Sequence, residues 1–318
     1  MAKMQLARKA LYNALKYHHP LDAEEWQQED LRLLSLEQLF ARLGKLGCNL
    51  DKDSFCLFAE EVDSPEDFAD DLIEDPKKQD QIFLPVFEIW RRLLPLKPSF
   101  SLIADELDEQ IHCYNAGIRD ERLLKALHAV LIALQSCLDK DLAKQDCQDL
   151  LETNTAYDVE GFLYEYIQES LDENQIALAS DLLEAFEPFI KDAEWFSLLQ
   201  LRILFQKDPE EAEELLKDIC FLAGELQDPE FYLEILGILA AKGDKETFLE
   251  IAEAALPLLE TEDQLQELLS SLALFWSSLD KDHKEEAVLL YLEARKNIPL
   301  DRALSAEDQK KVRVFLEA

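Results

Sequence analysis

The stretch EEAVLLYLEARKNIP, residues 285–299, places Ala287, Tyr291, Ala294 and Pro299 at spacings of four, three and five residues. Spacings of three and four bring side chains to one face of an α-helix, and a proline ends a helix because it lacks the backbone donor. The preceding stretch, QLQELLSSLALFWSSLD at 264–280, has a helical apolar pattern of its own. Together the two stretches predict an antiparallel helix pair.

Three similar helix pairs precede this one in the sequence. Their second helices carry comparable triads, which are Ala179, Leu183 and Phe186; Ala212, Leu216 and Ile219; and Phe248, Ala252 and Ala255. The first members of the triads, counted through to Ala287, are 33, 36 and 39 residues apart. Helix pairs of this length cannot bury their apolar faces alone and must stack on one another. The pattern therefore predicts an α-solenoid over residues 158–318.

This half of the chain resembles the tetratricopeptide repeat family. In that family the second helix carries a small residue, an aromatic residue four positions later and a terminal proline, as at Ala287, Tyr291 and Pro299. The stretch Lys242-Gly243-Asp244 is similar to the family's turn between helices, whereas Phe275 stands where the family's first helix carries glycine. The resemblance implies stacked helix pairs whose first helices line a concave, peptide-binding face. A helical bundle with accidental periodicity is the alternative.

The composition favours an all-α protein throughout. Only seven glycines occur in 318 residues, and 48% of the residues are hydrophobic, which is enough to form a sizeable core. Pro95 and Pro98 interrupt the helical pattern and suggest a hinge between domains. We expect an N-terminal helical bundle at 1–95, a connecting helical pair and cap at 99–157, and the repeat domain at 158–318.

The formal net charge is −36, and the acids are concentrated in the second half. Residues 1–150 hold 18 Lys and Arg against 29 Asp and Glu, and residues 151–318 hold 14 against 39. Such a field repels nucleic-acid phosphates and anionic lipids and attracts cations. It therefore favours a protein or peptide partner of basic or amphipathic character, with no nucleic acid. The alternative is that the acids are solvated helix faces that maintain solubility.

Several features predict a cytoplasmic protein without membrane insertion. No apolar run approaches the roughly 18 residues that a membrane span needs. The first twenty residues lack the apolar core and cleavage site of a secretory signal. None of the six cysteines forms a C-x-x-C pair, and a chain of this length does not need disulfides to fold, so reduced thiols are expected.

Two charged segments of the first half stand out. Residues 3–17 predict a basic amphipathic helix that docks on the rest of the chain, and the run EEVDSPEDFADDLIED at 60–75 holds nine acids and no base. Ser64 and Pro65 mark a helix start within this run. The run is interpreted either as an exposed helix or as a docking patch for a basic partner, and the basic helix is a candidate internal ligand for such a surface.

Enzymatic motifs are scarce, and the chain is predicted to be no enzyme and to need no cofactor. It lacks phosphate-binding glycine loops, the G-x-S-x-G elbow and the dinucleotide fingerprint. Glu109 and His112 have the Glu-x-x-His spacing of di-iron bundles, but such sites need a second pair, and Asp280 with His283 is the nearest approach. A helical metalloenzyme around Glu109 and His112 is the alternative function.

The preferred hypothesis is a non-enzymatic interaction scaffold, adaptor or chaperone-like subunit. If the family's phase is carried over, the positions on the first helices that would contact a partner are Tyr164, Gln168, Glu194, Leu201, Glu230, Leu233, Trp276 and Asp280. Aromatic and leucine side chains beside acids suit a basic amphipathic helix. Packing between repeats is the alternative role for Leu201, Leu233 and Trp276.

Overall fold

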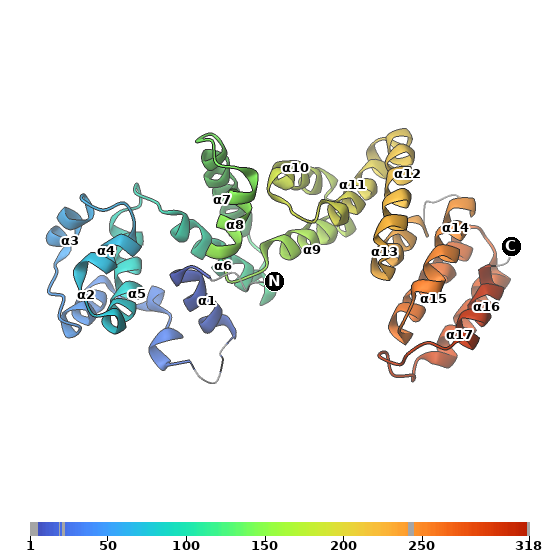
Figure 1. Ribbon diagram of the computed structural model, residues 1–318, viewed down its shortest axis with the longest axis horizontal. Helices are drawn as coiled ribbons and strands as arrows, with labels where there is room; N and C mark the ends of the chain where they lie inside the picture. Colours follow the sequence, from blue (N-terminus) through green and yellow to red (C-terminus); the bar gives the residue numbers. More distant parts are fainter. Residues whose placement is uncertain (1–5, 19, 21–22, 241–244, 317–318) are drawn as a thin grey trace. The chain divides into compact units, whose positions relative to one another are not determined.

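The computed structural model describes residues 6–18, 20, 23–240 and 245–316. Within these residues the chain forms seventeen α-helices and no strand, so the predicted all-α class is confirmed (Figure 1). Contacts divide it into two compact units, unit 1 at Met1–Glu165 with Ala185–Lys191, and unit 2 at Tyr166–Glu184 with Asp192–Ala318. The independence of the segments 1–95, 99–157 and 158–318 stays a prediction.

Unit 1 holds the first eight helices. They are α1 (Arg8–His18), α2 (Leu36–Lys45), α3 (Lys52–Ala59), α4 (Pro65–Leu72), α5 (Pro76–Leu93), α6 (Phe100–Asn115), α7 (Arg122–Leu138) and α8 (Lys144–Asn154). Local signals set several of these ends. The Ser64 side chain accepts a hydrogen bond from the Asp67 backbone at the start of α4, and Gly117 follows α6 with a φ of 84°. The start at Ser64 was expected from the sequence because serine caps a helix start, and glycine tolerates the left-handed conformation that follows α6.

An aromatic core connects α2 to α5 in unit 1. The Phe55 and Phe68 rings stack with centroids 4.4 Å apart, and Trp90 meets Phe68 edge to face at 6.0 Å. Phe83 and Phe87 of α5 are also buried in this cluster. Aromatic pairs in these geometries bury large apolar areas, so this core secures the acidic helix α4 against α5.

The basic helix α1 docks on α6 through charged side chains. Its Lys9 Nζ lies 2.8 Å from Asp105 Oδ1, and Lys16 Nζ lies 3.1 Å from Glu109 Oε2. Arg8 pairs with Asp70, an acid of the 60–75 run, at 2.9 Å. The basic segment is thus an internal ligand of acidic side chains. The described helix begins at Arg8, and the backbone N–H of Ala7 just before it donates to the backbone oxygen of Thr153 at 2.7 Å. Residues 3–5 of the predicted helix lie outside the described residues.

Unit 2 contains the last seven helices. They are α11 (Ala193–Lys207), α12 (Pro209–Leu226), α13 (Pro229–Leu239), α14 (Lys245–Ala255), α15 (Glu262–Ser278), α16 (Asp282–Arg295) and α17 (Ala306–Leu316). The helices α9 (Val159–Asp172) and α10 (Ile176–Phe186) lie across the division between the units. The turn expected at 242–244 lies outside the described residues.

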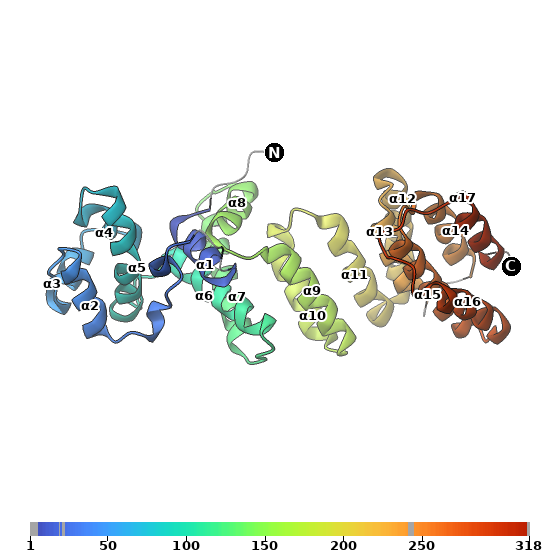
Figure 2. The same cartoon turned by 90° about the horizontal axis from the view of Figure 1, so that it is seen from below.

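The helices of unit 2 pack in the pairs that the periodicity predicted. Helix α11 packs on α12, α13 on α14 and α15 on α16, and the first helices α11, α13 and α15 are successive neighbours (Figures 1 and 2). The triad at Ala212 and the triad at Phe248 are buried in one shared core. There the Phe248 and Phe275 rings stack with centroids 3.8 Å apart, which joins the second and third pairs.

The triad on α16 differs from the sequence expectation. Ala287 and Ala294 are exposed and Tyr291 is half-buried, while Val288 and Arg295 are the buried residues of this helix. The cause is an ion network, in which Arg295 donates to Glu262 of α15 and to Asp308 of α17. A guanidinium is stable in the interior only when carboxylates accompany it. The network therefore turns inward the face of α16 that carries Val288 and Arg295, each one position after the alanines expected there.

Candidate interaction surface

The eight predicted partner-binding residues divide into buried and accessible groups. Leu201 is 0% exposed, and Leu233 and Trp276 are each 1% exposed, because all three fill the unit 2 core. A partner cannot reach them in this structure, and their alternative role in packing is the one observed. The accessible predicted residues are Tyr164, Gln168, Glu194, Glu230 and Asp280, of which the first two are half-buried.

A hollow on the first helices of unit 2 includes one of these predicted residues. It encloses about 320 Å³ and is lined by Gln168, Arg202, Phe205, Gln206, Glu234, Gly237 and Ile238. Arg202 is held at its edge by Asp172, 2.5 Å away. At Gly237 an added Cβ would meet no atom within 4 Å, so the missing side chain leaves space in the hollow. We call this feature the first-helix hollow.

Next to the first-helix hollow, acids gather on α13 and α15. Burial raises the pKa of Glu267, and Glu230, Glu234 and Asp263 raise it further by repulsion. Burial likewise raises the pKa of Glu234, where Arg202 opposes the shift and Glu230 adds to it. We call these four side chains the acidic ridge. Negative charges at this spacing disfavour the folded state unless a cation approaches them.

Three of the four acidic ridge residues, Glu234, Asp263 and Glu267, were missed by sequence reasoning although a signal for them exists. Glu230 and Glu234 are four residues apart on α13, and Asp263 and Glu267 are four apart on α15. Like charges at this spacing on a helix are destabilising. Two such pairs on neighbouring first helices bring these four acids close enough to act on one another.

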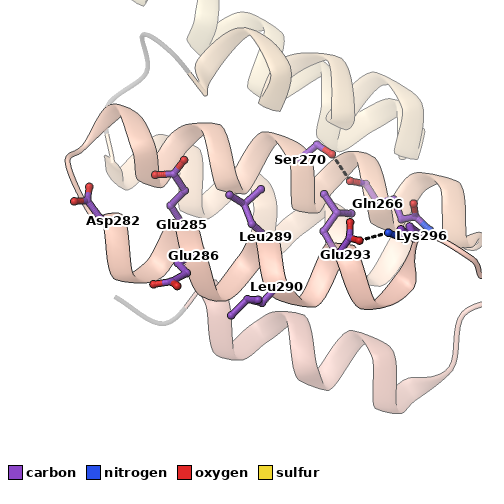
Figure 3. A pocket seen from close by; sticks show the side chains of 10 residues that line it. Gln266, Ser270, Asp282, Glu285, Glu286, Leu289, Leu290, Glu293 and Lys296 are labelled. Atoms are coloured by element: carbon purple, nitrogen blue, oxygen red, sulfur yellow. Dashed lines mark hydrogen bonds and ion pairs between the residues drawn. The ribbon is translucent and has the colours of Figure 1, made fainter.

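A larger groove lies along α15 and α16 (Figure 3). It encloses about 660 Å³, and its lining consists of Gln266, Ser270, Asp282, Glu285, Glu286, Leu289, Leu290, Leu292, Glu293 and Lys296. Leu289 is 45% exposed and Leu290 66% exposed. Acidic carboxylates flank both leucines in the view along α16. We call this feature the α15–α16 groove.

Comparison with known proteins identifies no relative. No family model matches the chain, and neither a curated protein nor a solved structure matches it. Functional inference therefore rests on the chemistry of these surfaces.

Glu109 and His112, the residues of the alternative metal site, have other partners in unit 1. Glu109 accepts hydrogen bonds from Lys16 at 3.1 Å and from the Tyr17 hydroxyl at 3.0 Å. The His112 ring stacks on Tyr17 with centroids 4.5 Å apart, and its Nδ1 lies 3.0 Å from the Tyr157 hydroxyl. Across the described ranges, no three His, Cys, Asp or Glu side chains converge as a metal site would require.

The negative charge of Glu109 is balanced by nearby positive charges. Burial acts to raise the pKa of Glu109, but Lys16 and Arg32 outweigh it, and the pKa lies below its usual range. This contrasts with the acidic ridge, where neighbouring acids raise the pKa of Glu267.

Among the helices of the described chain, none combines the length and apolar content that a bilayer crossing requires.

Proposed function

We propose that unit 2 is a protein-interaction module and that its first-helix face holds a basic segment of a partner protein. The observation that carries this proposal is the acidic ridge, whose Glu234 and Glu267 have raised pKa values. A Lys or Arg of a partner placed among these carboxylates would relieve the repulsion and favour their ionised form. The adjoining hollow offers the ring of Phe205 and the side chain of Ile238 to an apolar neighbour in the same segment.

The proposal extends to the type of protein. Helix pairs stacked through their first helices support a scaffold, adaptor or chaperone-like role of the tetratricopeptide repeat kind, in which recognition occurs without catalysis. The six free cysteines support a reducing, cytoplasmic setting. The charge of −36 supports a cationic protein partner over nucleic acid.

The test is capture of partners from a cell extract with immobilised full-length protein, analysed by mass spectrometry over a salt series. We expect a set of basic proteins whose retention falls as ionic strength rises above about 0.1 M, where charges are screened beyond about 10 Å. The variant with Glu234→Gln and Glu267→Gln is expected to lose most of this set.

A matched variant separates the surface from the charge. Glu210 and Glu214 form another exposed pair four residues apart, on α12, and line none of the surfaces described above. Changing both to Gln removes the same charge and is expected to leave retention unchanged. Equal retention by the wild type and the Glu234/Glu267 variant would contradict the proposal and leave the acidic ridge as solvated surface.

A further inference from the structure

The middle of α16 is apolar on every side. Residues 287–292 read AVLLYL, and six consecutive residues at 100° each cover the full circumference of a helix. A surface helix of a globular protein normally confines its apolar residues to one stripe. In α16 the core takes Val288, and Tyr291 and Leu292 pack against it, while Leu289 and Leu290 remain open to solvent.

The exposure of these leucines is set by the buried ion network. Arg295 Nε lies 2.7 Å from Glu262 Oε1, and its Nη1 lies 2.9 Å from Asp308 Oδ1, so α16 is secured to both α15 and α17. Turning Leu289 and Leu290 inward would withdraw Arg295 from two buried carboxylates, which is strongly unfavourable. The leucines are therefore presented by a helix that is held in place.

The walls of the α15–α16 groove are acidic. Asp282, Glu285, Glu286 and Glu293 line it, and Lys296, its one lysine, is paired with Glu293. The lysine within α16, Lys284, lies with its Nζ 4.0 Å from the centre of the buried Trp276 ring. Exposed leucines flanked by carboxylates are complementary to a partner surface on which apolar side chains are flanked by Lys or Arg.

The α15–α16 groove and the acidic ridge meet on α15. Gln266 and Glu267 lie three and four residues after Asp263, and Ser270 lies four and three residues after them, which places all four on one face of that helix. Asp263 and Glu267 belong to the acidic ridge, and Gln266 and Ser270 line the groove. A partner seated in the groove thus has acids along its length on both α15 and α16.

We propose that the α15–α16 groove is the docking site for an amphipathic helix of a partner protein, with leucine-type residues on one face and Lys or Arg beside them. Helix α16 has 14 residues, about 21 Å, which matches a ligand helix of three to four turns. This inference rests on the proposed function in one respect, the positive charge of the partner, and adds the helical form and the leucine anchor.

A second copy of this chain is a poor occupant of the groove. A twofold contact places the same patch of each protomer against the other, so four carboxylates would face four carboxylates. Repulsion of this kind opposes association. Dimerisation through this face is an outcome of the test that would overturn the proposal.

The test uses the full-length protein and two synthetic 18-residue peptides of equal Leu and Lys content. One peptide places leucines at i, i+3, i+4 and i+7, and the other has the same residues in scrambled order. Fluorescence anisotropy measures the affinity of each at two salt concentrations. We expect the patterned peptide to bind at least about tenfold more tightly, since it can bury a continuous leucine stripe.

Variants then locate the site. Leu289→Ser with Leu290→Ser is expected to weaken the patterned peptide about tenfold or more and to leave the scrambled peptide unchanged. The matched control is Leu226→Ser at the end of α12, a leucine 43% exposed in unit 2 and outside the groove. It is expected to have no effect, and thermal melts of all variants should coincide.

The outcomes separate this inference from the proposed function. Equal binding of the two peptides, or binding unaffected by the leucine variant, would overturn the helix-docking site. If the glutamine variants of Glu234 and Glu267 weaken both peptides while the leucine variant does not, the acidic ridge functions without the groove. If only the leucine variant weakens binding, the groove stands and the ridge proposal fails. A self-associating protein whose dimer is lost in the leucine variant would also overturn the inference.

Discussion

Two buried ion networks secure α1 in unit 1 and α17 in unit 2, and they are balanced differently. In unit 2, Glu262 is 0% exposed and accepts from Arg295 and Arg302, which also contact Asp308. Two cations thus meet two acids. Burial acts to raise both pKa values, but the pKa of Glu262 lies below its usual range because Arg295 and Arg302 donate hydrogen bonds to it, and that of Asp308 lies below its usual range because Ser305 and then the two arginines donate to it.

In unit 1 the cations pair with Asp105, whereas the hydrogen bonds to the nearby Asp108 come from neutral groups. Asp105 pairs with Lys9, Arg32 and Arg91. Asp108, one turn along α6 and 0% exposed, accepts instead from the Asn13 amide at 2.8 Å and from the backbone N–H of Ala156 at 2.9 Å. Burial raises the pKa of Asp108 to about 7, and these neutral donors only partly oppose it. Hydrogen bonds without charge therefore satisfy a buried carboxyl group but do not keep it ionised.

The largest expected effect on stability comes from removing Arg295, the central cation of the network in unit 2. Arg295→Met leaves Glu262 and Asp308 buried with less compensation, so we expect the free energy of unfolding to fall by about 3–5 kcal/mol. Urea unfolding monitored by circular dichroism measures it. Arg313→Met on the exposed face of α17 is the control and should change stability by less than about 0.5 kcal/mol. A loss no greater than in this control would show that the network does not stabilise unit 2.

The second test uses pH and addresses unit 1. Asp108 has a pKa of about 7 in the folded protein and about 3.9 when unfolded, so the folded state holds an extra proton between these values. The free energy of unfolding should therefore rise as pH falls from about 7 to about 4, by up to about 4 kcal/mol. Asp108→Asn should remove this dependence. Urea unfolding of both proteins over the pH series measures it, and identical profiles would contradict the account.

The sign is reversed for unit 2. The lowered pKa values of Glu262 and Asp308 mean that their contribution to stability is present above the unfolded value of about 4 and is lost as pH falls through the folded values. Hydrogen exchange of α17 amides should accordingly increase in acid below about pH 4, while the contribution of Asp108 to the protection of α1 amides should grow as pH falls from about 7 and be complete near about 4. This opposite trend sharpens the comparison within a single molecule.

The smallest expected effect concerns an acid whose neighbours are mainly other acids. On the acidic ridge, Glu267→Gln removes repulsion with its acidic neighbours and should raise stability by about 0.3–0.5 kcal/mol, a modest value because water screens this partly exposed group. Thermal melts measure it, with Glu225→Gln on α12 as the control. A destabilised Glu267→Gln protein would show that this carboxylate has a structural role.

Local features of the sequence predicted much of the fold. Ser64 with Pro65 marks a helix start through contacts within one turn, and the apolar spacing identified the helix pairs of unit 2. The rotation of α16 could not be read in this way. It depends on the contacts of Arg295 with Glu262 and Asp308, which are 33 and 13 residues away in the sequence. The sequence pattern alone favoured the adjacent Ala294 as the buried residue, because it fits the spacing of the other repeats.

The candidate site shows the same division. Glu230 and Gln168 were predicted by carrying over the phase of the repeat family, and they belong to the acidic ridge and to the lining of the first-helix hollow, respectively. Leu201, Leu233 and Trp276 were not distinguishable from surface anchors, because an apolar residue on a first helix packs equally well against a neighbouring helix or a partner. Likewise, the partner of Glu109 became evident only when α1 was seen beside α6.

The glycine in the first-helix hollow has an implication for how this protein would respond to selection. Gly237 lies within α13 in an exposed position, where glycine costs a helix up to about 1 kcal/mol relative to alanine, and an added methyl group would touch nothing. Alanine or a larger helix-forming residue is thus expected to make the molecule more heat-resistant while it fills the hollow. A laboratory evolution experiment that rewards heat resistance alone should exchange Gly237 early and lose recognition with it, whereas joint selection for heat resistance and recognition should retain the glycine.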